Sequence, residues 1–167
     1  IPSCYIEEMQ GITYGADISI EDLAVSYMTV LYMDLQCFTY VAWSNATEDN
    51  KLYHIRSMDF SLEKKDPISS KYVQENSILI VRKPKDSLMS IIPSFSGWIN
   101  AYSGVNEEQI TIGVEVCWSS DQTLEGIPAQ FRIQQVMDSA SDINKGIGFL
   151  TSNNSATRGK PPVISFV

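Results

Sequence analysis

The sequence predicts an α+β fold in which helices pack against antiparallel β-sheet. Short apolar runs rich in β-branched and aromatic residues recur through the middle of the chain, each bounded by polar turn residues, as is typical of strands. Helical spacing of apolar residues is found near both ends, at about 19–33 and 131–150. Helices that accompany an antiparallel sheet in this way usually cover one face of a layered domain.

The strand pattern is found at 38–45, 51–59, 77–82, 88–93 and 105–116. The polar stretch between the first two runs predicts a hairpin, so that residues distant in sequence become neighbours. The segment between Phe60 and Ser77 contains Pro and mixed charges, which indicates a solvated surface loop.

The helical signals have recognisable ends. The pattern over residues 3–33 predicts a pair of amphipathic helices. Gly15 is expected to end the first helix, and Ser19 to cap the second. Near the C-terminal end, Ser141 or Asp142 is a candidate cap for the later of two further helices.

Composition excludes several classes of function. A chain of 167 residues is long enough for one domain with a sizeable core. The net charge of -8 argues against a general binder of nucleic acids or anionic membranes, and no apolar run reaches transmembrane length. The three cysteines form no disulfide framework and no Cys/His cluster has metal-ligand spacing, so we expect no metal or other cofactor.

The start of the chain says little about where the protein is found. No basic-then-apolar signal segment is visible, which leans towards the cytoplasm. Because the chain begins at Ile1 rather than Met, an upstream segment can have been removed. Compartment and oligomeric state are therefore left open.

The candidate site is carried by the first hairpin. Cys37 begins its first strand, and Arg56 and Asp59 stand near the end of the second, so all three are expected side by side. A cation beside a thiol favours the thiolate, and a carboxylate can orient an amine or accept a proton. The structural alternative is that Cys37 is a small buried hydrophobe and that the Arg–Asp pair is a surface ion pair.

The same residues resemble a known motif. Cys37 together with residues 52–60, LYHIRSMDF, is similar to the nucleophile hairpin of the N-terminal-nucleophile (Ntn) hydrolases. The closest branch is the isopenicillin N acyltransferase family, with choloylglycine hydrolases and acid ceramidase as cousins. Ser57 replaces the Asn usual in that family, and Ile55 replaces a Gly. Residues 105–113 resemble a second family hairpin, with Gln109 in place of a left-handed glycine, which implies local strain or a different turn.

The resemblance implies an αββα sandwich of layered antiparallel sheets. It also implies that Cys37 is the nucleophile and that its own α-amine, released by self-cleavage between Gln36 and Cys37, is the general base. Arg56 would stabilise the thiolate and Asp59 would hold the amine. Residues 1–36 would then be a propeptide-like helical segment, and residues 37–167 the N-terminal part of a catalytic domain acting on a small-molecule amide.

Some features depart from the family. Choloylglycine-type relatives have an Asn that helps to bind the oxyanion. At the corresponding position this chain has Glu115 or Val116, so the oxyanion residue is left unassigned. Asn106 is expected to be a turn residue rather than a catalytic one. The tail, 159–167, also departs from the family pattern, in which a strand with an Asp-containing ending is expected. Family members usually continue for much longer. Either the missing C-terminal half is separate polypeptide, or the chain is a shortened form or a short relative.

Two classes of function therefore remain. The first is a cysteine Ntn amidohydrolase or acyltransferase; the second is a catalytically silent fragment or binding module that retains the hairpin. A papain-like pair of Cys37 and His54 fits poorly in order and spacing.

The substrate cannot be read from the sequence. Four aromatic residues are candidates for an acyl pocket, although core packing explains their spacing better: Phe38, Tyr40, Trp98 and Tyr102. Cys117 beside Trp118 is expected to be a packed strand residue.

Overall fold

The computed structural model describes residues 1–32, 36–100, 102–116, 126–151 and 162–166, and it confirms the α+β class. Strands β1 (Gln36–Ala42) and β2 (Tyr53–Asp59) form a two-stranded antiparallel sheet. The second sheet is antiparallel in the order β3-β4-β5-β6-β7. Its strands are β3 (Ser77–Arg82), β4 (Ser90–Phe95), β5 (Ser103–Asn106), β6 (Thr111–Val116) and β7 (Pro162–Phe166).

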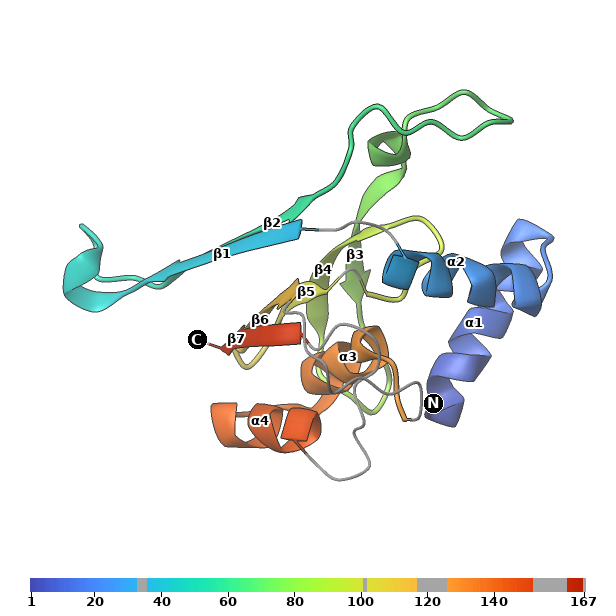
Figure 1. Ribbon diagram of the computed structural model, residues 1–167. Helices are drawn as coiled ribbons and strands as arrows, with labels where there is room; N and C mark the ends of the chain where they lie inside the picture. The colour runs from blue at the N-terminus through green and yellow to red at the C-terminus, as the bar shows by residue number, and fades with distance from the viewer. Residues whose placement is uncertain (33–35, 101, 117–125, 152–161, 167) are drawn as a thin grey trace.

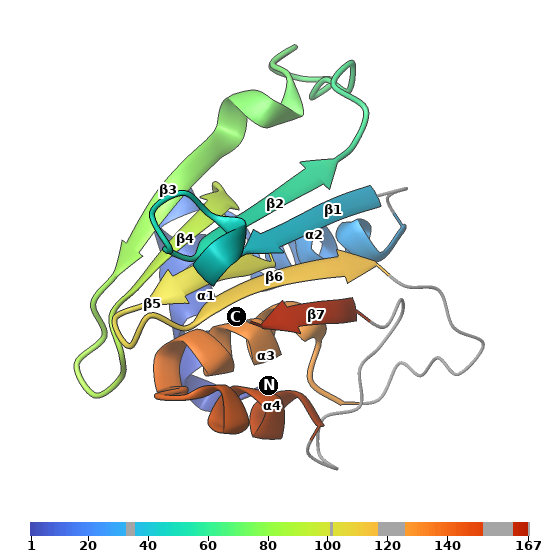
Figure 2. The same cartoon turned by 90° about the vertical axis from the view of Figure 1, so that its left-hand side faces the viewer.

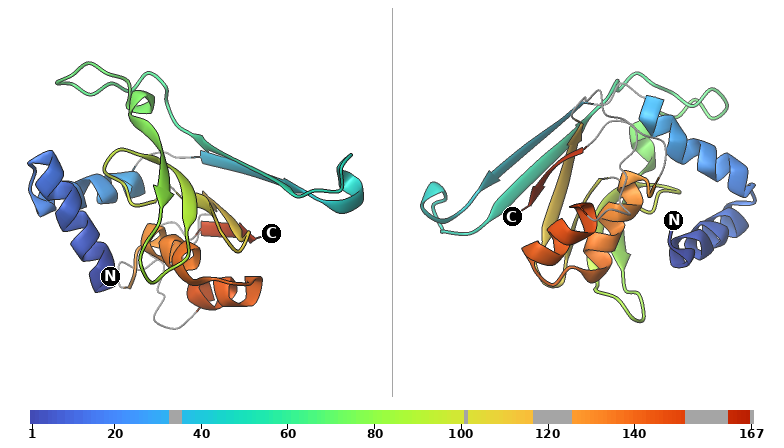
Figure 3. Two further views of the ribbon diagram at one scale, coloured as in Figure 1. Left: turned by 180° about the vertical axis from the view of Figure 1, so that it is seen from behind. Right: turned by 60° about the horizontal axis from the view of Figure 1, so that its bottom comes forward.

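The described elements form three layers (Figures 1 and 2). The hairpin lies over one face of the five-stranded sheet, in contact with β6. Helices α3 (Ala129–Ser139) and α4 (Ile143–Thr151) cover the opposite face (Figure 3). Helices α1 (Ser3–Ala16) and α2 (Ile20–Tyr32) pack beside α3. The described part of the chain provides no helical layer over the outer face of the hairpin.

Most predicted elements are confirmed, with shifted ends. The hairpin is present, although β1 begins at Gln36 and its loop includes a short 3-10 helix, Ser44–Ala46. The loop after Phe60 also contains such a helix, Val73–Asn76. In the tail, Pro162–Phe166 forms a strand that the sequence pattern did not predict, paired with β6. Cys117 and Trp118 lie outside the described residues.

The helix caps follow the predicted chemistry, with one correction. The Asp22 backbone N–H donates to Ser19 Oγ at 3.0 Å, and the Lys145 N–H donates to Asp142 Oδ1 at 2.9 Å, so Asp142 caps α4. The prediction that Gly15 ends the first helix is wrong by one residue. The helix continues to Ala16, and Asp17 takes the left-handed conformation with φ 53°.

Alternation along β6 gives the sheet its two faces. Ile112 and Val114 point to the helical side, where they join a core with Ile133, Val136 and Met137 of α3. Thr111 and Gly113 therefore face the hairpin. The apolar side of β6 thus builds the core while its small and polar side receives the candidate site.

A second core attaches the N-terminal helices. Tyr5 and Met9 of α1 and Leu23 and Tyr27 of α2 pack with Phe131 of α3 and with Ile99. Ring stacking continues through this cluster, with the Tyr27 and Phe131 centroids 5.6 Å apart. The helical segment that precedes Cys37 is therefore an integral part of the folded domain.

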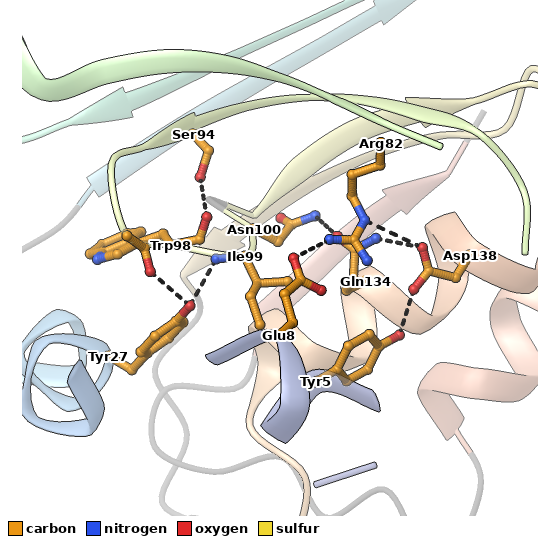
Figure 4. A network of polar contacts seen from close by, with 11 residues as sticks. Tyr5, Glu8, Tyr27, Arg82, Ser94, Trp98, Ile99, Asn100, Gln134 and Asp138 are labelled. Atoms are coloured by element: carbon orange, nitrogen blue, oxygen red, sulfur yellow. Dashed lines mark hydrogen bonds and ion pairs between the residues drawn. The ribbon is translucent and has the colours of Figure 1, made fainter. Parts of the chain in front are cut away.

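Polar contacts run alongside this core (Figure 4). Tyr5 Oη donates to Asp138 Oδ2 at 2.9 Å, and Arg82 pairs with Glu8 of α1. Tyr27 Oη donates to the Gly97 carbonyl at 3.0 Å and accepts the Ile99 N–H at 2.8 Å. Buried polar groups are tolerated when they are paired in this way, so the network fixes α1 and α2 against the sheet and α3.

The hairpin can approach β6 closely because residue 113 is glycine. A Cβ placed on Gly113 would lie 2.8 Å from His54 Nε2 and 3.3 Å from Arg56 Cγ. Both side chains come from β2, so any side chain at this position would separate the two sheets.

We expect Gly113→Ala to destabilise the protein by about 1–3 kcal/mol, because overpacking at a tight contact displaces its neighbours. Chemical denaturation of the variant and the wild type measures the change. Gly11→Ala is the matched control, since Gly11 lies in α1 with no atom near its missing Cβ and Ala favours a helix. Equal stability of Gly113→Ala and wild type would show that the sheets are not held this closely.

Candidate functional site

The hairpin register sets the positions of the candidate residues. Cys37 pairs with Met58 and Thr39 with Arg56, so these four side chains project from the same face of the hairpin. That face is directed at the five-stranded sheet, since Arg56 donates hydrogen bonds to the Val114 carbonyl of β6; Figure 2 shows the hairpin and this sheet side by side. Arg56 is the diagonal neighbour of Cys37, as the predicted hairpin requires.

Arg56 links the thiol to the second sheet. Its Nη2 donates to Cys37 Sγ at 2.9 Å, and its Nε and Nη2 donate to the Val114 carbonyl at 3.2 and 3.1 Å. Burial lowers the pKa of the guanidinium, whereas the neighbouring Cys37 sulfur raises it. The cation is thereby fixed in orientation against the sulfur, and a cation in this position stabilises a thiolate.

Asp59 lies at the same end of the hairpin but on its other side. It pairs with Gln36, the residue before Cys37, and alternation directs its side chain away from the face that carries the thiol. Its carboxylate is exposed and makes no hydrogen bond or ion pair within the described residues. Its charge nevertheless contributes to raising the pKa of Arg56. The structure therefore brings Arg56 to Cys37, and brings Asp59 to the backbone before it.

His54 belongs to the same face but not to the same site. It pairs with Val41, four residues along β1 from Cys37, which corresponds to roughly 13 Å at about 3.3 Å per residue. Its Nδ1 lies 2.8 Å from Thr111 Oγ1, and burial lowers the pKa of the ring. A papain-like Cys–His pair is incompatible with this spacing.

Tyr102 is a neighbour of the site whose role the sequence did not reveal. Its carbonyl accepts the Val114 N–H at 3.0 Å, and its hydroxyl donates to Gln130 Oε1 at 3.1 Å. Burial raises the pKa of this phenol, and the charges of Arg56 and Cys37 also act on it. Its φ of 66° is unusual for a non-glycine residue. No sequence pattern marks an aromatic residue in this backbone conformation.

The turn between β5 and β6 behaves as the sequence suggested. Gln109 adopts φ 64°, the left-handed conformation for which glycine is usual. Asn106 is a turn residue, since its Oδ1 accepts the Ile110 N–H at 3.0 Å. Its Nδ2 donates to the Ala140 carbonyl at 2.8 Å, which ties the turn to the end of α3.

Two cavities flank the hairpin. One, of about 390 Å³, includes His54 and Arg56 together with residues of β4, β5 and β6. The other, of about 280 Å³, includes Met58, Phe60, Phe95 and Trp98. Of the aromatic residues considered for an acyl pocket, Trp98 lines a cavity, whereas Phe38 and Tyr40 lie on the exposed outer face of the hairpin.

Two further findings concern the described residues. Within these ranges, no group of three His, Cys, Asp or Glu side chains is placed to hold a metal ion. No described helix is long and apolar enough to cross a membrane.

No protein-family model matches the chain, and no curated protein sequence matches it significantly.

Cys37 is only partly exposed. We nevertheless expect it to react with iodoacetamide near neutral pH faster than Cys4 does, because Arg56 stabilises the thiolate. Arg56→Met, which removes the charge, should slow the reaction several-fold, and Arg56→Lys should slow it less. Peptide mapping by mass spectrometry measures each rate separately. Cys4, which is exposed on α1, provides the internal control. Unchanged labelling of Cys37 in Arg56→Met would remove the electrostatic argument.

Proposed function

We propose that this chain is a cysteine Ntn-type amidohydrolase or acyltransferase, which acts on a non-peptide amide through a thioester at Cys37. The contact of 2.9 Å between Arg56 Nη2 and Cys37 Sγ carries the proposal. It joins a thiol to a fixed cation at the first strand of a hairpin, in the arrangement that the resembled motif requires.

The proposed mechanism also needs a general base that takes the proton of the Cys37 thiol. The sequence contains one histidine, and His54 is too far along the hairpin to serve Cys37. An α-amine at Cys37 would stand beside its own thiol and has an ordinary pKa near 8. Asp59 pairs with Gln36 across the hairpin, so its backbone lies opposite the peptide bond at which this amine would form, and its carboxylate would have to turn towards the new amine to hold it. These positions favour a nucleophile that supplies its own base after cleavage between Gln36 and Cys37.

Maturation would begin with attack of the Cys37 thiolate on the Gln36 carbonyl carbon. The C–S bond forms, the C–N bond breaks, and the amide nitrogen takes the proton that the thiol gave up, so that it leaves as the neutral α-amine of Cys37. Water then hydrolyses the thioester, which returns the thiol and leaves a carboxylate on Gln36. No reactant besides water is needed.

Turnover would repeat this chemistry on a substrate amide. The α-amine takes the thiol proton, the sulfur attacks the substrate carbonyl, and the proton passes to the departing amine. Water, or a second amine in the acyltransferase reaction, then attacks the thioester and frees the acyl group. Arg56 would stabilise the sulfur anion before each attack.

The layers are compatible with the αββα architecture that the resemblance implies. Helices, sheet and hairpin supply three successive layers, and the outer face of the hairpin exposes large apolar side chains: Phe38, Tyr40, Tyr53 and Ile55. We propose that further polypeptide of the same domain, equivalent to the missing C-terminal half, covers this face and supplies the fourth layer.

We expect the complete gene product to break between Gln36 and Cys37 on standing and then to hydrolyse a small amide. Intact-mass analysis detects the two pieces, and release of p-nitroaniline from acyl anilides measures turnover. Cys37→Ala should abolish both reactions, while Cys37→Ser is expected to cleave slowly because an alkoxide forms less readily than a thiolate.

The matched control is Cys4→Ala, which removes the exposed thiol of α1 and should leave both reactions unchanged. Amide hydrolysis by a wild-type chain still joined at Gln36–Cys37 would contradict the α-amine mechanism. Absence of both reactions in the complete protein would favour the catalytically silent alternative.

After cleavage, we expect residues 1–36 to remain bound to the rest of the protein. Tyr5, Met9, Leu23 and Tyr27 are buried against Phe131 and Ile99, and burial of such side chains contributes about 1.5–3 kcal/mol each. Size-exclusion chromatography in native buffer should give one peak containing both pieces, which separate in guanidinium chloride. Separate elution in native buffer would contradict this prediction.

A further inference from the structure

We infer that the cavity of about 280 Å³ beside Met58 binds the acyl part of the substrate and restricts it to apolar groups of medium length, up to about ten carbon atoms. This inference rests on the proposed amidase or acyltransferase function of Cys37. It adds a substrate class that the thiol and its neighbours do not determine.

The first observation behind the inference is the position of the cavity. Met58 lines it and is also the direct cross-strand partner of Cys37. Directly opposed residues have Cβ atoms about 4.5–5.5 Å apart and project from the same face of a hairpin. Cys37 does not line the cavity itself, but its thiol is the cross-strand neighbour of a wall residue, at a spacing that an acyl group leaving the cavity can span to bring its carbonyl carbon to the sulfur.

The second observation is the apolar character of the side chains that line the cavity. Phe60, Phe95 and Trp98 form a continuous aromatic wall, with the Phe60 and Phe95 centroids 6.0 Å apart and the Phe95 and Trp98 centroids 5.5 Å apart. Val73 and Met58 complete its apolar lining, and none of the lining side chains is charged. Such a site favours a hydrocarbon or a single aromatic ring and disfavours a charged group.

The third observation is the volume of the cavity. A protein cavity of about 150 Å³ accommodates benzene, which has six carbon atoms. By the same measure, a volume of about 280 Å³ holds roughly eleven carbon atoms. An octanoyl or phenylpropanoyl group fits, whereas a hexadecanoyl chain or a sterol acid exceeds the space.

A series of p-nitroanilides from acetyl to hexadecanoyl, given to the complete matured protein, tests the inference. We expect kcat/KM to rise roughly two- to fourfold for each added CH₂, as hydrocarbon enters the cavity, and to fall again beyond about ten carbons. Val73→Phe, which fills the cavity from the short helix 73–76, should move the optimum to shorter chains. A profile that rises to hexadecanoyl, or an optimum that Val73→Phe leaves unchanged, would overturn the inference while leaving the amidase proposal in place.

A pair of matched variants guards against general effects on folding. Phe60→Leu enlarges the cavity and should move the optimum to longer chains. Phe38→Leu makes the same change on the opposite face of the hairpin, away from the cavity, and should leave the optimum where it is. Equal profiles for these two variants would also count against the cavity.

A binding measurement separates this inference from the catalytic proposal. In Cys37→Ala, octanamide should shift the indole N–H signal of Trp98 in a nitrogen–proton correlation spectrum, and acetamide should not at the same concentration. Trp98→Phe identifies the signal. A shift without any turnover by the wild type would support an apolar acyl site and refute the amidase. Absence of a shift would overturn the acyl site itself.

Discussion

The contact between Arg56 and the Val114 carbonyl joins the two sheets, and the rest of the site depends on it. A two-stranded hairpin is at best marginally stable alone, so it needs a surface to lie on. Here the surface is the small and polar side of β6, where Gly113 leaves room for the side chains of β2. The guanidinium that holds the hairpin in place also reaches Cys37 Sγ. The contacts that attach the hairpin thus also place the cation beside the thiol.

This arrangement has an electrostatic consequence. Burying a guanidinium is costly unless it is well paired, and burial alone lowers the pKa of Arg56. A thiolate at Cys37 opposes that effect, so the two charges stabilise each other in the space between the sheets. Asp59 lies on the opposite, exposed side, and its charge also contributes to raising the pKa of Arg56.

The sequence predicted those features that depend on neighbouring residues. Alternation located the hairpin, and side-chain oxygens at Ser19 and Asp142 located helix caps. It also placed Arg56 diagonally to Cys37, because hairpin pairing follows from strand positions. Features that depend on how layers meet were not predictable. Gly113 is special only because β2 crosses over it, and Tyr102 matters only because the charges of Arg56 and Cys37, which belong to the other sheet, act on its phenol. Strand β7 was missed because its pairing partner is far away in the chain.

The two faces of the hairpin are reversed relative to an ordinary surface hairpin. Antiparallel strands usually turn apolar residues to the core and polar residues to water. Here the inner face carries His54 and Arg56, while Phe38 is 57% exposed and Ile55 59% exposed on the outer face. Because side chains alternate, a strand that sends its reactive groups inward must send the intervening residues outward, and in the middle of the hairpin these are the apolar Phe38, Tyr40 and Ile55. An apolar outer face of this kind is typical of a sheet that is covered on both sides, and a covered hairpin would also exclude water from the thiol and strengthen its interaction with Arg56. The proposed fourth layer and the proposed chemistry therefore follow from the same alternation.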